Sequence, residues 1–388
     1  MSRKRKGGAG PFPRSVPPVA PVAPAAEETV ERRPAPLTRP DPADLYAALD
    51  LGTNSCRMLI AQPKGNQLHV VDSFSKSVQL GQGLEASGRL SRASMARAVG
   101  ALKICQKKLV KHRVGRMRLV ATEARRRAAN AAEFISVVQR ETGLELEIIQ
   151  PEEEARLAVV SCAPLVSMKT EQLLVVDIGG GSTELVWIDL GRVPRVERPR
   201  AIMRLHQGFD HEETLFPRAK VVDWISIPLG VATLKDMYSD VADDGARFAL
   251  MSWFFEEQLA TFSPYDDAAD QAREGFQIIG TSGTVTTVAA SHLGLRRYDR
   301  TKVDGLRMTS DQIDNVIQQY LVLGPDGRRR DPRIGRDRQT LIMSGAAILQ
   351  ALLRAWPTDR LSVADRGLRE GLLYAQMSAD GVLEDGAV

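Results

Sequence analysis

Cysteine and histidine are scarce in this 388-residue chain, and neither forms a metal-binding pattern. The three cysteines, Cys56, Cys105 and Cys162, lack the spacing of a zinc motif and cannot all pair, so reduced thiols in a cytoplasmic protein are the simplest interpretation. The five histidines are scattered without a His-x-x-x-His pair, which argues against zinc chemistry. Cys56 has no histidine beside it in the sequence, which argues against a thiol nucleophile.

Long apolar segments and aromatic residues are scarce as well. No stretch of about 18 consecutive apolar residues is present, and no apolar core of a secretory signal, so we expect no membrane association. Aromatic residues make up 5% of the chain and none lies within the arginine-rich segment 328–338, which argues against nucleic acid as a partner. The net charge is only +4, but the pI near 9.0 is compatible with an anionic substrate.

Segment 328–338 concentrates positive charge, with six arginines in eleven residues that glycine and proline interrupt. We therefore expect a basic loop here. It could guide a long anionic substrate, or it could simply be a solvated surface loop, and the sequence leaves both readings open. The arginines are Arg328, Arg329, Arg330, Arg333, Arg336 and Arg338.

The first 44 residues differ in composition from the rest of the chain. They hold ten of the 21 prolines, many alanines and a basic cluster at 3–6, with almost no large apolar side chains, so we predict a disordered tail rich in Pro, Ala and Arg. The remaining residues, roughly 340, suffice for two domains. We place these at 45–153 and 154–388, with C-terminal helices at 341–356 and 368–376 that can pack back on the first domain.

Two segments 127 residues apart repeat one pattern. An apolar, strand-like run at 46–51 and another at 173–178 each end in Asp and Gly, continue with small hydroxyl or amide residues, and lead into a second apolar run. Each unit reads as a β-hairpin whose turn can close backbone N–H groups on an anion, since glycine leaves no Cβ in the way. An ordinary tight hairpin would explain one copy, but two copies with matching acids favour a duplicated phosphate loop.

The acids in these loops predict a metal ion. A carboxylate that faces a bound phosphate repels it unless a cation lies between them, and Mg²⁺ typically uses one or two protein carboxylates together with phosphate oxygens. The candidate ligands are Asp50, Asp177 and Glu184. A third Gly-hydroxyl segment at 280–284 lacks an acid and precedes a helix-like stretch, which suits a phosphate, a ribose or a chain end.

In this order and spacing, the segments Asp-Leu-Gly-Thr-Asn-Ser at 50–55, Asp-Ile-Gly-Gly-Gly-Ser-Thr-Glu at 177–184 and Gly-Thr-Ser-Gly-Thr at 280–284 resemble the exopolyphosphatase and guanosine pentaphosphate phosphatase (Ppx/GppA) family. Segments at 121–130, 153–157 and 365–371 extend the resemblance to nearly the whole chain after residue 44. It implies an α/β fold of two actin-like (ribonuclease H-like) domains with an active-site cleft between them. The chain looks like the short form of the family, without its C-terminal HD-like region, and a homodimer remains open.

The resemblance also implies an activity. It indicates metal-dependent hydrolysis of the terminal phosphoanhydride of inorganic polyphosphate, with Glu154 in the place of the glutamate that activates water and Mg²⁺ or another divalent cation at the acids. Glu152 and Glu153 read as ordinary acids of a helix first turn. The phosphate-binding residues that the resemblance and the loops together indicate are Gly52, Thr53, Asn54, Ser55, Arg126, Gly179, Gly180, Gly181, Ser182 and Gly283.

Other functions fit the same residues. Guanosine pentaphosphate 5′-phosphatase activity is an enzymatic variant that the sequence cannot rank against polyphosphate hydrolysis. A binding protein that senses polyphosphate or the nucleotide without turnover is a different class, and a kinase of the same superfold is a weaker choice. An intact Glu154 together with intact metal acids favours hydrolysis over sensing.

Overall fold

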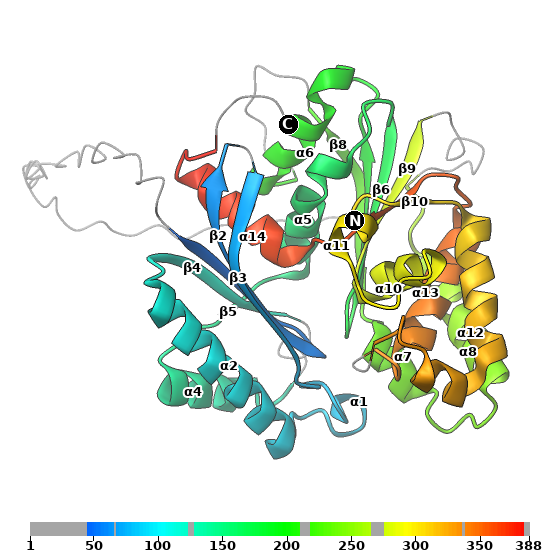
Figure 1. Cartoon of the computed structure of the whole chain (residues 1–388), viewed down its shortest axis with the longest axis horizontal. Coiled ribbons are helices and arrows are strands. Elements are labelled where there is room, and N and C mark those ends of the chain that lie inside the picture. Colours follow the sequence, from blue (N-terminus) through cyan, green and yellow to red (C-terminus); the bar gives the residue numbers. More distant parts are fainter. Residues whose placement is uncertain are drawn as a thin grey trace, which may run out of the picture. The chain divides into compact units, whose positions relative to one another are not determined.

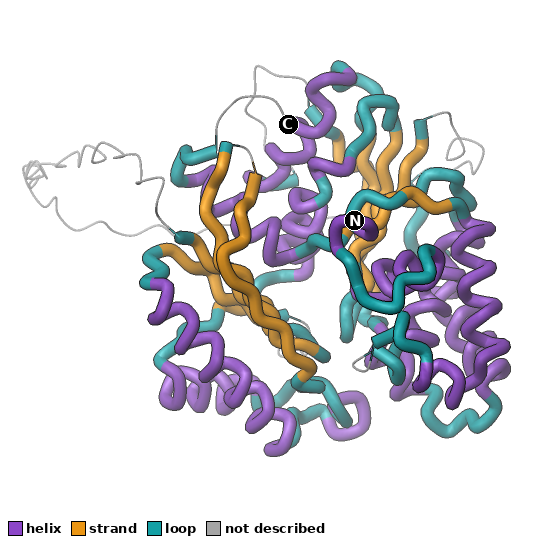
Figure 2. The backbone as a smooth tube through the Cα atoms, viewed as in Figure 1, coloured by secondary structure: helices purple, strands orange, loops and turns teal. Residues whose placement is uncertain are grey.

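The computed structural model describes residues 45–65, 67–122, 128–209, 218–264, 275–335 and 338–383. All of them belong to one unit, Arg39–Val388. The predicted tail at 1–44 lies outside the described residues, as do Arg126 and Arg336. Figure 2 shows the strands of the described part as two separate groups with helices around them.

The first sheet is built on the earlier of the two predicted hairpins. Its strands run in the order β3-β2-β1-β4-β5, with β1 antiparallel to β2 and parallel to β4. Helices α2 and α4 cover one face, where Leu49 and Met58 pack with Leu102 and Phe134 (Figure 1). The bounds are β1 Tyr46–Leu51, β2 Ser55–Lys64, β3 Gln67–Ser77, β4 Arg116–Ala121, β5 Glu147–Ile148, α1 Leu84–Ser87, α2 Arg92–His112 and α4 Ala131–Thr142.

The second sheet repeats this plan. Its order is β10-β11-β9-β6-β7-β8, and β6 is antiparallel to β7 and parallel to β9, as β1 is to β2 and β4. One face packs Leu174 and Trp187 against helices α8, α10, α12 and α13, and the other packs Leu173 and Val175 against α5 and α6. The strands are β6 Gln172–Ile178, β7 Thr183–Asp189, β8 Lys220–Ile227, β9 Phe276–Thr281, β10 Arg307–Met308 and β11 Leu361–Ala364.

The other α-helices of the described fold pack their apolar faces toward these sheets. They are α5 Pro151–Ser161, α6 Arg198–Arg204, α7 Val231–Met237, α8 Asp244–Leu259, α10 Gly283–His292, α11 Arg300–Val303, α12 Ser310–Arg330, α13 Ile342–Ala355 and α14 Leu368–Ala379, with 3₁₀ turns η1 Ala163–Leu165, η2 Arg195–Glu197 and η3 Leu205–Gln207. Among these residues no helix is long and apolar enough to cross a membrane.

The last helix, α14, packs on the first sheet although it lies at the opposite end of the sequence. Leu372 and Met377 join Tyr46 and Leu59 in one apolar cluster, and the amide of Gln376 donates to Ala47 O at 3.2 Å. The helix also crosses α5 at very short range, because a Cβ added to Gly371 would lie 2.0 Å from Leu157 O. Both the first sheet and α5 therefore depend on α14 for their packing.

The predicted basic loop at 328–338 is wrong for its first three arginines. They form the last turn of α12, which bends at Gly324 (φ 63°) and continues through Pro325. Arg328 is buried because its guanidinium binds the carboxylate of Asp244 at 2.7 and 2.9 Å and Tyr320 O at 2.7 Å. A salt-bridged arginine under a helix end is a packing feature, which a charge count along the sequence cannot distinguish from a solvated loop.

Candidate active site

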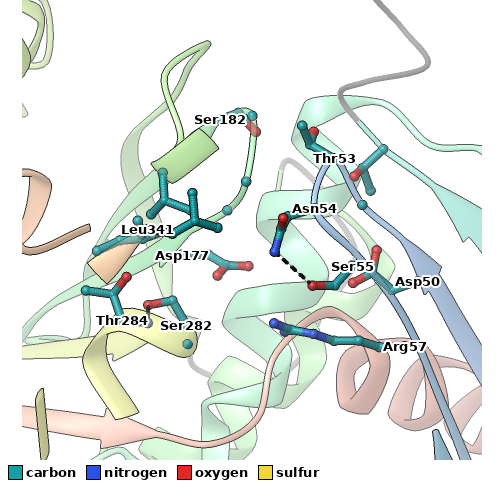
Figure 3. A pocket seen from close by; sticks show the side chains of 18 of the residues that line it. Asp50, Thr53, Asn54, Ser55, Arg57, Asp177, Ser182, Ser282, Thr284 and Leu341 are labelled. Carbon is teal, nitrogen blue, oxygen red and sulfur yellow. Dashed lines mark hydrogen bonds between the residues drawn. The ribbon is translucent and has the colours of Figure 1, made fainter. Parts of the chain in front are cut away.

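Both predicted phosphate loops line one pocket (Figure 3). The pocket brings together residues from β1, β2, β3, α5, β6 and the start of α10, and it includes nearly every residue that the sequence singled out. The expected residues in its lining are Asp50, Gly52, Thr53, Asn54, Ser55, Glu154, Asp177, Gly179, Gly180, Gly181, Ser182 and Gly283. Two are not among them: Arg126 lies outside the described residues, and Glu184 is placed elsewhere.

The two loops form the same turn. In loop 1, residues 52–55, Gly52 N–H donates to Ser55 O at 3.0 Å, and in loop 2, residues 179–182, Gly179 N–H donates to Ser182 O at 2.9 Å. The loops also approach each other closely, since a Cβ on Gly180 would lie 3.1 Å from Asn54 N. A side chain at Gly180 would therefore press directly on loop 1, which explains glycine at this position.

Loop 2 is held from behind by the N-terminus of α7. Val231 N–H donates to Gly179 O at 3.0 Å and Ala232 N–H donates to Gly180 O at 2.8 Å. In a trans peptide the N–H and the C=O point in opposite directions. Because the carbonyls of Gly179 and Gly180 point toward α7, the N–H groups of Gly180 and Gly181 point away from this helix. The amides of Gly180 and Gly181 are thereby available to an anion in the pocket that both residues line.

Loop 1 is held by the chain that follows β3. Asn54 O accepts hydrogen bonds from Val78 N and Gln79 N at 2.8 and 2.9 Å, and Thr53 O accepts one from Gly81 N at 2.9 Å. The hydroxyl of Thr53 is buried, with the residue 5% exposed, and finds no hydrogen-bond partner in the described part of the chain. A buried hydroxyl without a partner is costly, which indicates that a ligand of this pocket completes it.

The acids at the ends of β1 and β6 both line the pocket, but they have different neighbours. Burial raises the pKa of Asp50 to about 6, and the charge of Asp177 adds to this effect, whereas those of Arg57 and Arg369 oppose it. Burial likewise raises the pKa of Asp177, against the effect of a hydrogen bond donated by Thr281 Oγ1. In both carboxyls, burial disfavours the charged form.

Of the three expected metal acids, only Asp50 and Asp177 line the pocket. Glu184 is 2% exposed and accepts a hydrogen bond from Ser226 Oγ at 2.8 Å, and it does not line the pocket. Glu184 lies opposite Asp177 in the β6–β7 ladder, so the two side chains are on the same face of the sheet, and ligation by Glu184 stays a prediction. In the described ranges, no group of three or more His, Cys, Asp or Glu residues is arranged to hold a metal ion.

Glu154 reaches the pocket from the first turn of α5. The side chain is largely buried, with the residue 9% exposed, and it lines the pocket together with Thr122. Its neighbour Glu153 binds Arg118 at 3.0 Å instead and is absent from the lining. One of three consecutive glutamates is therefore directed at the phosphate loops.

The third Gly-hydroxyl segment also contributes to the pocket. Ser282 lies between β9 and α10 at φ 147°, a strained conformation for a residue with a side chain, and its hydroxyl accepts hydrogen bonds from Thr284 N and Val285 N. The guanidinium of Arg338 lies over Gly283, where an added Cβ would be 3.2 Å from Arg338 Nε. Glycine at position 283 therefore leaves space for the guanidinium of Arg338 as well as for a ligand.

Three arginines that the sequence analysis did not assign to the site belong to it. Arg57 and Arg338 line the pocket, and both also line a second, adjoining cavity, together with Arg369 and Asp365. Burial lowers the pKa of Arg57, and the charges of Arg369 and Arg338 lower it further. Positive charge is thus concentrated next to the loops, which suits a ligand with several negative charges. Arg338 is held in place by the hydroxyls of Thr286 and Thr287, at 3.2 and 2.6 Å.

The two mixed sheets and the pocket between their glycine-rich loops define an α/β protein, and comparisons with known proteins identify its family. Residues 59–380 match the model of the Ppx/GppA phosphatase family, and the chain belongs to this family. A solved Ppx/GppA family member from Aquifex aeolicus is 30% identical, with a TM-score of 0.66 over 87% of this chain and 98% of that chain. An exopolyphosphatase from Cytophaga hutchinsonii, 22% identical with a TM-score of 0.71 over 87% of this chain and 98% of that one, shares the fold.

A curated relative from Aeromonas salmonicida bears the name guanosine-5′-triphosphate,3′-diphosphate pyrophosphatase. It is 29% identical over 331 residues, which cover 85% of this chain and 59% of the relative. A second from Aeromonas hydrophila has the same name and coverage and is 28% identical. The chain thus spans about three fifths of the length of the curated relatives that it matches.

Proposed function

We propose that this protein is a metal-dependent exopolyphosphatase that hydrolyses the terminal phosphoanhydride of inorganic polyphosphate and releases orthophosphate. The observation that carries this proposal is the position of Glu154, a carboxylate on α5 that shares one pocket with both phosphate loops. A pocket for sensing alone would need the loops and the arginines but no carboxylate at the phosphate. We further propose that the enzyme acts in the cytoplasm, where its three buried, unpaired cysteines stay reduced.

In the proposed reaction the terminal phosphoryl group lies between the two loops. The amides of Gly180 and Gly181 and the hydroxyl of Thr53 donate hydrogen bonds to its oxygens, and Arg57 and Arg338 compensate the charge of the phosphates that follow. Glu154 orients a water molecule and accepts its proton as the oxygen attacks phosphorus, while the bond to the bridging oxygen breaks. The shortened chain carries that oxygen away. Positioning and charge compensation supply most of the rate enhancement in such reactions.

The residues present fit a magnesium ion. Asp50 and Asp177 are two pocket carboxylates whose pKa values are raised, so a cation near them would be favoured. Two carboxylates suffice for Mg²⁺, which takes its other ligands from water and from phosphate oxygens. We therefore propose Asp50 and Asp177 as its ligands and leave out Glu184. When bound, the ion would neutralise phosphate charge and polarise the phosphoryl group.

Guanosine pentaphosphate is the second candidate substrate, because the Aeromonas relatives are named for hydrolysis of this nucleotide. Its 5′-triphosphate end would present the same phosphoanhydride to the loops. The deciding experiment measures orthophosphate release by the purified protein from polyphosphate and from guanosine pentaphosphate, with Mg²⁺ and with a chelator. If the protein releases orthophosphate from neither substrate but binds one of them tightly, the proposed hydrolase would have to be replaced by a sensor.

Glu154→Gln tests the proposed base. We expect kcat to fall by at least about 100-fold with little change in substrate affinity, since general-base catalysis contributes roughly 10²–10⁴. Glu153→Gln is the matched control on the same helix turn, because this side chain binds Arg118 and does not line the pocket. A Glu154→Gln enzyme that keeps its kcat would remove Glu154 from the reaction.

A further inference from the structure

Strand β3 contributes two serines to the pocket that neither the motifs nor the proposed chemistry uses. Ser75 and Ser77 both line it, and Ser73, two residues earlier, does not. Within the described part of the chain, neither pocket hydroxyl has a protein hydrogen-bond partner. A role for them rests on the proposed function, because it concerns the substrate of the same cleft.

The ladder register places these serines on the same face as the catalytic groups. Ser77 pairs with Ser55 and Ser75 pairs with Arg57, and Arg57 in turn pairs with Asp50 on β1. Directly opposed residues in an antiparallel ladder share a face, as do residues two apart on one strand. Asp50, Arg57 and Ser75 therefore form one row across three strands, and Ser55 and Ser77 form the next.

This part of the face is open because α14 covers only the other part. Ala48 and Leu59, on the same face, pack under α14 in an apolar cluster. The helix begins at Leu368, which itself lines the pocket, so the sheet beyond it faces the cavity instead. The polar rows thus begin where the apolar packing ends.

An independent observation indicates that a ligand lies along this wall. The buried hydroxyl of Thr53 lines the same pocket and has no partner among the described residues (Figure 3). The chain leaving β3 is joined to loop 1 by the hydrogen bond from Val78 N to Asn54 O, one residue after Ser77. The unpartnered hydroxyl and the two serines therefore belong to one continuous wall of the pocket.

We propose that Ser75 and Ser77 form a chain-positioning subsite for inorganic polyphosphate, next to the phosphoryl group that is hydrolysed. Hydroxyls on alternate residues of a strand are about 6.8 Å apart, so together they line a stretch of the wall along which a chain of phosphates can lie. They donate hydrogen bonds to phosphate oxygens without adding charge, while Arg57 in the same row supplies it. At the two serines themselves, only neutral hydrogen bonds have to break when the chain shifts by one phosphate after each cleavage.

The test compares a Ser75→Ala/Ser77→Ala double variant with Ser73→Ala, the control on the same strand and face. For long-chain polyphosphate the double variant is expected to raise KM by about 5- to 150-fold, more than it lowers kcat, since each lost hydrogen bond contributes roughly 0.5–1.5 kcal/mol. The rise should be smaller for tripolyphosphate, which has fewer phosphates to hold. An unchanged KM for long chains, or an equal rise for both substrates, would overturn the subsite.

A binding measurement keeps the test independent of turnover. Affinity for long-chain polyphosphate is measured in Glu154→Gln protein with and without the two serine substitutions, and we expect them to weaken binding in the presence of Mg²⁺. If the wild-type protein hydrolyses nothing but this loss of affinity persists, the proposed function fails and the subsite stands. If guanosine pentaphosphate loses as much affinity as long-chain polyphosphate, the serines bind phosphates common to both and the assignment to the chain is wrong.

Discussion

Loops 1 and 2 have the same turn but are supported in different ways. The carbonyls of loop 2 are bound by the N-terminus of α7, whereas those of loop 1 are bound by the extended chain after β3. Loop 2 is therefore fixed by a helix and presents mainly backbone amides, while loop 1 also presents the buried, unpartnered hydroxyl of Thr53. Two copies of one motif can thus bind an anion in different ways, one through backbone amides and the other also through a side-chain hydroxyl.

The largest expected effect comes from the support of loop 2. A Cβ on Gly230 would lie 2.5 Å from Gly179 O, Gly180 C and Gly181 N, so Gly230→Ala must displace the loop backbone. We expect kcat/KM to fall by about 100-fold or more, as for a displacement of about 1 Å in a catalytic site. The readout is phosphate release by protein that thermal unfolding shows to be folded.

The corresponding change at loop 1 is Gly81→Ala, whose Cβ would lie 2.3 Å from Thr53 Cγ2, a side-chain atom. Because the threonine side chain can rotate away, a loss of about 10-fold is expected, smaller than for the backbone displacement. Gly100→Ala, within α2 and with no atom near its added Cβ, is the control. Equal losses at Gly230 and Gly81 would show that the two supports do not differ.

Asp50, which lies on β1 just before loop 1, gives the next largest expected effect, and this effect is on stability. The pKa of Asp50 in the folded protein is about 6, above its ordinary value of 3.8, so its contribution to stability is complete below about pH 4 and is lost as the pH rises through 6. Without metal, Asp50→Asn should raise the free energy of unfolding near pH 7.5 by about 3 kcal/mol and have little effect near pH 4. Thermal unfolding with a chelator at both pH values measures this difference, and destabilisation at pH 7.5 would contradict it.

The same acid sets the pH dependence of metal binding. Protons compete with the cation for the Asp50 carboxyl below about pH 6, so Mg²⁺ affinity should fall as the pH drops from 7.5 to 5.5 and binding should release protons. Calorimetry in buffers of different ionisation enthalpy detects this release. Asp50→Asn should weaken binding and remove the release, whereas a pH-independent affinity would exclude Asp50 as a ligand.

The smallest effects compare two threonines. Thr183 Oγ1, just after loop 2, donates to Leu229 O at 2.8 Å, whereas Thr53 Oγ1 has no partner among the described residues. Thr183→Val should therefore cost about 1 kcal/mol of stability, and Thr53→Val should cost none but raise KM several-fold. A loss of stability at Thr53 with unchanged KM would mean that its hydroxyl does not serve the substrate.

The sequence predicted those parts of the site that local patterns encode. Strands at 46–51 and 173–178 and the helix at 341–356 are confirmed to within one residue, because apolar runs are local signals. The Ppx/GppA family and an α/β fold are confirmed too. The prediction of a basic loop failed at 328–330, because the decisive partner of Arg328, Asp244, is distant in sequence.

The arginines were missed for a related reason. Arg57 lies opposite Asp50 only through the register of the β1–β2 hairpin, a signal that the turn at 52–55 could have supplied. Arg338 lines the pocket and Arg369 lines the adjoining cavity, both from segments more than 280 residues away from Asp50 in the sequence. Site residues on the motifs were accessible from sequence, whereas those brought in by packing were not.

The packing of α14 has a consequence for how the protein is made. The bond from Gln376 to Ala47 joins residues 329 positions apart, and the same helix presses on α5, which carries Glu154. During synthesis, the first sheet and the helix with the glutamate must therefore wait for nearly the whole chain before they can reach their final packing. Contacts of such long range slow folding, and a ribosome-bound chain that stops before residue 368 should display an uncovered apolar face and no activity.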